Sequence, residues 1–105
     1  MSYAVEFTPG ARQDLLRLYA SLIEHAQFVE DLQLAERALD AIVTATDVHL
    51  SQTPLIYRKA AGGKGLRREL LVPFGSTGYV VLYDIAGPAK IVVLAVRHQR
   101  EQDYH

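Results

Sequence analysis

The end of the chain is the feature that most constrains what it can fold into. Residues 91–96 (IVVLAV) are all apolar, and residues 97–101 (RHQRE) directly after them are all polar. An apolar run of this length, rich in β-branched side chains, is typical of a buried strand. Polar groups that follow a buried strand lie at the rim of its sheet, where a rigid scaffold exposes them to solvent. The sequence therefore predicts a binding or catalytic rim at this point.

The composition limits the class of protein. A chain of 105 residues, 50% of them hydrophobic, suffices for a packed core, and we expect a single domain spanning residues 1–105. The sequence has no cysteine, which excludes disulfides and thiolate chemistry. The first residues lack the pattern of a signal peptide, and no apolar run has membrane-spanning length. We therefore expect a cytoplasmic protein without membrane contact.

Charge is divided unevenly along the chain. Residues 1–57 hold three arginines and eight acidic residues, a net charge of −5. Residues 58–105 hold eight lysines and arginines and four acidic residues, a net charge of +4, so the formal total is −1. A basic C-terminal part favours an anionic partner, and the alternative is a face that only solvent contacts.

Helix signals dominate the first half of the chain. Alternating apolar residues indicate a strand at 3–7, after which Thr8 and Pro9 are suited to the N-cap and the first position of a helix. Two apolar stripes at helical spacing then predict a helix to about residue 27 and a second at about 31–51. The short link between them makes the two helices an antiparallel hairpin.

Strand signals dominate the second half. A flexible basic loop at 55–65 precedes three strands, expected at about 66–73, 78–85 and 90–97. The order is thus β-α-α-β-β-β, and it predicts an α+β fold in which the helical hairpin packs on a largely antiparallel sheet.

The strand expected at 78–85 is apolar on both sides. Alternation assigns one side Tyr79, Val81, Tyr83 and Ile85, and the other side Val80 and Leu82. Two helices cover only one face of a four-stranded sheet, so the other face needs a different cover. Three covers remain open: the C-terminal tail, a second copy of the chain, or a partner protein.

A group of cations around the glycines at 62, 63 and 65 is the first candidate for target or nucleic-acid binding. Its members are Arg58, Lys59, Lys64, Arg67 and Arg68. If all five touched phosphates, binding would depend on salt with a logarithmic slope of roughly −3.5 to −4.5. The alternative is a mobile, solvated loop. The spacing is not that of a nucleotide-binding Walker loop.

Two residues at the predicted rim have both a functional and a structural interpretation. His98 is suited to proton transfer or to a hydrogen bond with phosphate, and alternatively it caps the strand end. Tyr104 is suited to stacking on a base or bonding a phosphate, and alternatively its ring packs on the sheet. The four histidines do not have metal-ligand spacing, so we predict neither a metal site nor a cofactor.

Taken together, the strand order and four segments resemble the RelE/ParE superfamily. The segments are 65–70 (GLRREL), 72–75 (VPFG), 78–83 (GYVVLY) and, most specifically, 93–101 (VLAVRHQRE). These proteins are the small toxins of type II toxin–antitoxin modules, often described as plasmid-stabilisation proteins. The resemblance implies a growth inhibitor neutralised by an antitoxin segment that lies along the toxin, in a heterotetramer or larger complex.

The superfamily has two branches, which differ in their target. RelE-like toxins cut messenger RNA in the ribosome, and in this chain the resemblance would give that role to Arg97, His98, Arg100 and Tyr104. ParE-like toxins inhibit DNA gyrase without such a set. Gln99 stands where the RelE-like pattern has an arginine, and an amide cannot replace the bidentate, permanent charge of a guanidinium. We therefore favour the ParE branch, with a RelE-like endoribonuclease or a degenerate antitoxin-binding module as alternatives.

Overall fold

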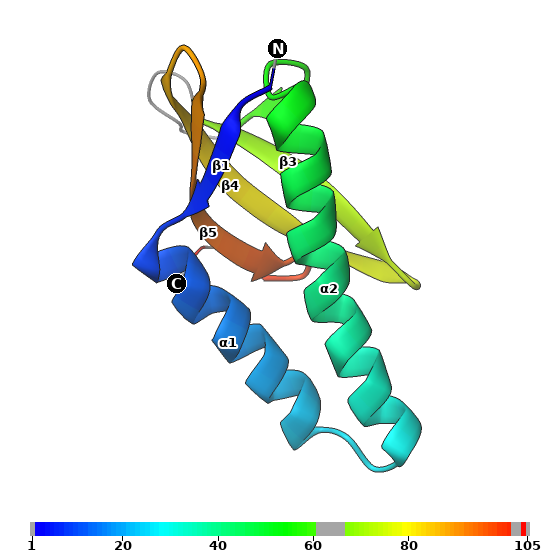
Figure 1. The fold of residues 1–105 in the computed structure, drawn as a ribbon. Helices are drawn as coiled ribbons and strands as arrows, with labels where there is room; N and C mark the ends of the chain where they lie inside the picture. The colour runs from blue at the N-terminus through cyan, green and yellow to red at the C-terminus, as the bar shows by residue number, and fades with distance from the viewer. Residues whose placement is uncertain (1, 61–66, 102–103, 105) are drawn as a thin grey trace.

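The computed structural model describes residues 2–60, 67–101 and 104, which form two helices and five strands (Figure 1). In chain order the elements are β1 Ala4–Phe7, α1 Pro9–Glu24, α2 Val29–Gln52, β2 Arg58–Lys59, β3 Arg68–Phe74, β4 Thr77–Gly87 and β5 Lys90–His98. Within the described residues, neither helix is both long and apolar enough to cross a membrane.

The strands form one sheet in the order β1-β5-β4-β3-β2. Strand β1 pairs with β5 in parallel, and the remaining neighbours pair antiparallel. Both helices pack on the same face of this sheet, and the connected end of the hairpin extends beyond the strands (Figure 1). The predicted α+β fold, a helical hairpin on a largely antiparallel sheet, is confirmed.

The expectation that residues 55–65 form a loop is wrong in one respect, because Arg58–Lys59 form β2. Arg58 lies opposite Glu69 and Lys59 opposite Arg68, and the pairing continues where the Ala60 amide donates to the Arg67 carbonyl at 3.1 Å. Backbone pairing and the ion pair of Arg58 with Glu69 stabilise this edge strand. Its two side chains are both charged, so the hydrophobic alternation by which strands are recognised in a sequence is missing. Residues 61–66, which include Lys64, lie outside the described residues.

The helix bounds differ slightly from those expected. Thr8 and Pro9 take the predicted N-cap and first-turn positions, with the Thr8 hydroxyl accepting from the Ala11 amide at 3.1 Å. The link between the helices, however, is residues 25–28, earlier than expected. Its end is fixed by Asp31, whose carboxylate accepts from the amides of Gln27 and Phe28 at 3.0 and 3.1 Å. Because Asp31 lies in the first turn and caps the amides that precede the helix, α2 begins before Asp31 itself.

The core lies between the helical hairpin and one face of the sheet. Helix residues such as Leu18, Ile42 and Leu50 belong there to one hydrophobic cluster with residues of the sheet, including those of its central strand, β4. The strand contributes to this core the alternating set predicted from the sequence: Tyr79, Val81, Tyr83 and Ile85. We call the opposite side the open face, and its strand residues are Glu69, Leu71, Val80, Leu82, Ala95 and Arg97.

A β-bulge at Leu94 determines which side chains reach each face near the end of β5. Leu82 pairs with Ala95 but Tyr83 pairs with Val93, so the register passes over Leu94. An extra residue in one strand shifts every later side chain to the other face. Val96 and His98 consequently face the helices, whereas Arg97 lies on the open face.

The bulge is supported from helix α1. Asp14 is only 5% exposed, and its Oδ2 accepts from the Val96 amide at 2.9 Å. The bulge interrupts the hydrogen bonding between β4 and β5, which would leave the Val96 amide unpaired. The Asp14 carboxylate accepts a hydrogen bond from this buried amide and so satisfies it.

We therefore expect Asp14→Ala to lower the free energy of unfolding by about 2 kcal/mol, because it leaves the Val96 amide buried without an acceptor. Urea denaturation followed by circular dichroism measures this loss. Asp40→Ala, at an exposed position of α2, is the matched control and should change stability by less than about 0.5 kcal/mol. Equal effects of the two substitutions would contradict the role given to Asp14.

Tyr83 ties the segment after α2 to the centre of the sheet. Its side chain is fully buried, and its hydroxyl donates a hydrogen bond to the Pro54 carbonyl. Burial raises the pKa of Tyr83 to about 12, although the nearby Arg68 charge lowers it in part. The folded protein therefore holds this phenolic proton more tightly than the unfolded chain does.

This raised pKa predicts a specific alkaline instability. Up to pH 10 both states keep the proton, so the stability that Tyr83 contributes is fully present. Between pH 10 and 12 only the unfolded chain releases it, and the stability advantage of the wild type over Tyr83→Phe should shrink by about 1.4 kcal/mol per pH unit. Denaturation curves of both proteins at pH 8, 10 and 11 measure this difference in the free energy of unfolding. A difference that stays constant with pH would refute the prediction.

Candidate functional site

The residues predicted as a catalytic set do not form one cluster. Arg97 and His98 are adjacent in β5 and so lie on opposite faces of the sheet, and the bulge at Leu94 determines which face each residue takes. Tyr104 stacks beside Arg97, with the guanidinium carbon 5.1 Å from the ring centroid. Arg100 is exposed in the turn after β5. The end of β5 is thus a rim with two separate sides.

Arg97 organises the turn that follows β5. Its side chain is 13% exposed, and its Nη1 donates to the Glu101 carbonyl at 2.5 Å. The same nitrogen lies 3.3 and 3.4 Å from the carbonyls of His98 and Gln99. A guanidinium directed at the backbone of its own turn acts as a structural cap.

Glu69 is the acidic centre of the open face, and the sequence analysis did not identify it as a site residue. The residue is 7% exposed, its Oε1 accepts from Nε of Arg58 at 3.0 Å, and the same oxygen forms an ion pair with Nη2 of Arg58, also at 3.0 Å. Its Oε2 accepts from the Tyr104 hydroxyl at 2.5 Å and lies 3.9 Å from Nη2 of Arg97. The available signal was its position as the first acid after the cations at 58–68.

Tyr104 is held as a neutral hydrogen-bond donor. Burial raises the pKa of its phenol well above the usual value, and the hydrogen bond and negative charge of Glu69 raise it further. The interpretation that this ring packs on the sheet is the one the structure supports. Tyr104 thus covers part of the open face, and a cover from this part of the chain is the first of the three possibilities left open.

His98 lies on the side of the helices and is hydrogen-bonded at both ring nitrogens. Its Nδ1 accepts from the Arg100 amide at 3.0 Å, so in the neutral ring Nε2 carries the proton and donates to the Thr77 hydroxyl, also at 3.0 Å. The ring meets Tyr79 edge-on with centroids 5.4 Å apart. His98 thus caps the strand end.

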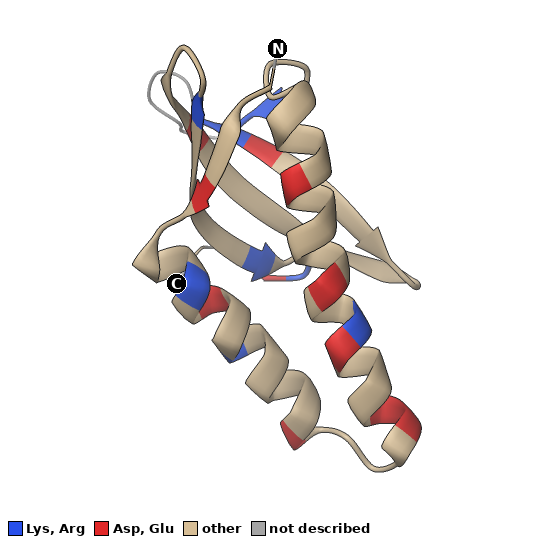
Figure 2. Ribbon diagram, viewed as in Figure 1, with Lys and Arg blue, Asp and Glu red and all other residues tan. Residues whose placement is uncertain are grey.

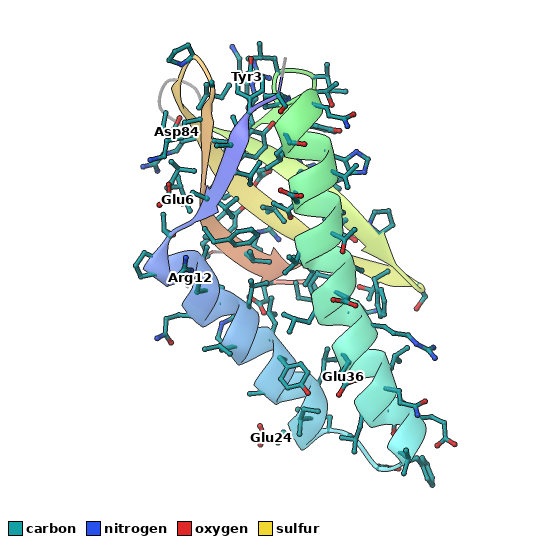
Figure 3. All side chains as sticks on the ribbon, viewed as in Figure 1. Tyr3, Glu6, Arg12, Glu24, Glu36 and Asp84 are labelled. Carbon is teal, nitrogen blue, oxygen red and sulfur yellow. The ribbon has the colours of Figure 1, made fainter. Side chains whose placement is uncertain are left out.

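An open cleft of about 650 Å³ begins at His98 and runs between the helical hairpin and the turn from β3 to β4. The apolar part of its lining is Leu22, Ala26, Leu34, Ala35, Phe74 and Tyr79. Arg37 and Asp31 of α2 add charged groups at its wall. Figure 3 shows the side chains that extend from the two helices in this region.

The predicted group of five cations is divided among different environments. Arg58 is paired with Glu69, while Arg68 donates to the Tyr57 carbonyl at 2.6 Å on the side of the helices. Lys59 and Arg67 are exposed, and Lys64 lies outside the described residues. In Figure 2 a red acidic segment directly follows the blue basic start of β3. Among the described members of this group, Lys59 and Arg67 have the freest access to a target, and binding by the group stays a prediction.

The chemistry available at the rim is hydrogen bonding and charge. Among the described residues, no group of three His, Cys, Asp or Glu side chains lies close enough to hold a metal ion. The rim presents exposed Arg100 on a turn fixed by Arg97, with the apolar cleft beginning at His98. Rigid polar groups beside an apolar cleft suit the binding of another macromolecule.

Comparison with known proteins agrees with this architecture. Residues 5–103 match the family model described as the ParE toxin of the type II toxin–antitoxin system parDE. Toxin RelE3 of Caulobacter vibrioides is 33% identical over 99 residues, covering 94% of this chain and 97% of that protein. A structure of the chromosomal ParDE toxin–antitoxin system from P. aeruginosa has the same fold, with a TM-score of 0.70 and 17% identity over 91% of this chain and 95% of the other.

The two arginines of the rim should differ sharply in their effect on stability. We expect Arg97→Ala to cost about 2 kcal/mol, because it removes the cap of the turn and leaves the buried Glu69 with fewer partners. Arg100→Ala, at an exposed position, should change stability by less than about 0.5 kcal/mol. Urea denaturation of both variants makes the comparison, and equal costs would mean that Arg97 does not organise the turn.

Proposed function

The chain belongs to the ParE toxin family of type II toxin–antitoxin systems, and from this membership we propose that it arrests growth by inhibiting DNA gyrase. The family implies a cognate antitoxin as partner. In the proposed cycle the toxin is inactive in a cytoplasmic complex with this antitoxin, a heterotetramer or a larger assembly. The free toxin then acts by binding.

The observation that carries this proposal is the separation of His98 from Arg97 and Tyr104. General acid–base cleavage of RNA needs a base, an acid and a phosphate-binding cation within reach of the same bond. Here Arg97 caps its own turn, and the Tyr104 phenol is bonded to Glu69. His98 faces the opposite side of the sheet. These internal bonds favour inhibition by binding over catalysis.

Ribosome-dependent cleavage of messenger RNA is the second candidate. It is favoured by the name of the Caulobacter relative, Toxin RelE3, and by the closeness of His98 to the exposed Arg100. In this alternative, His98 and Arg100 act on the RNA from the side of the cleft, and the exposed Lys59 and Arg67 contact phosphates. A degenerate module that binds only its antitoxin is a further outcome that the experiment below distinguishes.

The proposal is tested by expressing the chain without its antitoxin. We expect growth arrest with a DNA damage response and intact messenger RNA, together with inhibition of purified gyrase in a plasmid supercoiling assay. Co-expression of the antitoxin, the matched control, should restore growth. Arrest with new ends on translated messages would replace gyrase inhibition by RNA cleavage, and continued growth would favour the degenerate module.

Substitution of His98→Gln together with Arg100→Ala separates the two toxin mechanisms. Glutamine keeps an acceptor for the turn but cannot act in proton transfer, and Arg100 is exposed, so the fold should persist. Cleavage by a nuclease should fall at least a hundredfold, in line with the usual contribution of general acid–base groups. If the chain instead inhibits gyrase, neither the wild type nor the double variant cleaves messenger RNA.

A further inference from the structure

We propose that Glu69 is a positioning residue that holds the C-terminal tail, residues 99–101 and Tyr104, against the open face in the arrangement used for growth inhibition. The hold itself follows from the geometry of the open face. Its importance for growth inhibition rests on the function proposed above.

The two oxygens of Glu69 connect separate parts of the molecule. Oε1 binds Arg58 on the edge strand β2, and Oε2 binds the Tyr104 hydroxyl near the end of the chain. Glu69 itself lies within β3, paired with Leu82 of the central strand β4. One carboxylate on a rigid strand therefore fixes both an edge strand and the tail.

Arg97 completes the hold on the same face. Its guanidinium lies over the ring of Tyr104 and donates to the Glu101 carbonyl at 2.5 Å. From helix α1, Nη1 of Arg17 reaches the Glu101 carboxylate at 3.0 Å. The tail is thus attached at Glu101 to a helix and a strand, and at Tyr104 to Glu69.

The burial of Glu69 makes this arrangement more than a surface contact. A buried carboxylate is stable only when its oxygens are hydrogen-bonded or paired with cations. Tyr104, Arg97 and Arg58 supply those partners, and each is on a different segment of the chain. Because Glu69 requires these partners, release of Arg97 or Tyr104 from it is unfavourable.

A held tail matters for binding because it presents the rim in one conformation. Arg100 is exposed within a turn whose carbonyls are fixed by Arg97. If the tail were released, a partner would have to order it on binding, which weakens association. Loss of the hold should therefore reduce growth inhibition without unfolding the protein.

Two conservative variants test the hold, each with a matched control. Tyr104→Phe removes only the hydroxyl that binds Glu69, and Tyr19→Phe makes the same change on α1. Glu69→Gln removes the negative charge of the Glu69 carboxylate, and Glu6→Gln makes the same change at the outer edge of β1 (Figure 3). Hydrogen exchange by mass spectrometry compares peptides of the tail with peptides of β4, and growth is scored after induction without antitoxin.

We expect Tyr104→Phe and Glu69→Gln to accelerate exchange in the tail by about fivefold or more, while β4 stays protected. Both should weaken growth arrest, and the two controls should behave as the wild type. Unchanged tail exchange in Tyr104→Phe and Glu69→Gln would overturn the hold. Faster tail exchange with full growth arrest would overturn the positioning role. A wild-type chain that does not arrest growth would refute the proposed function. The exchange rates would then still test whether Glu69 holds the tail on the open face.

Discussion

The hydrogen bond from the Val96 amide to Asp14 is the interaction on which the arrangement at the end of β5 depends. It stabilises a bulge at Leu94, where the pairing of β5 with β4 slips by one residue. Without the slip, the alternation that buries Ile91 and Val93 would continue and turn Arg97 towards the helices. A buried carboxylate on α1 thus determines which side of the sheet receives the guanidinium and which receives His98.

Once Arg97 lies on the open face, it needs a counter-charge, and Glu69 of β3 provides one at 3.9 Å. Glu69 in turn draws in Arg58 and the Tyr104 hydroxyl, so two cations of the basic C-terminal part share one carboxylate within the protein. The number of cations in the sequence therefore overstates the number of cations that are free to bind a partner. The exposed Lys59, Arg67 and Arg100 are the described cations of this region with the freest access to solvent.

Much of the fold could be predicted because its signals are local. The Thr8 N-cap, the apolar stripes of the helices and the alternation of β4 depend on residues close in sequence, and all are confirmed. The bulge could not be predicted, since Leu94 and Ala95 sit inside an unbroken apolar run that looks the same in either register. Strand β2 and the role of Glu69 were missed because both depend on charge pairs between distant segments.

The same limits explain why the family was easier to identify than the mechanism. A sheet with a helical hairpin supports both binding and catalysis, and the difference lies in a few side chains at the rim. For catalysis those side chains must be free to meet a substrate at one place. In this chain Arg97 and Tyr104 complete a network centred on Glu69, and His98 caps the strand from the other side. Groups that stabilise one another in this way make a rigid surface at the end of β5, and such rigidity supports the proposed action by binding over the alternative of catalysis.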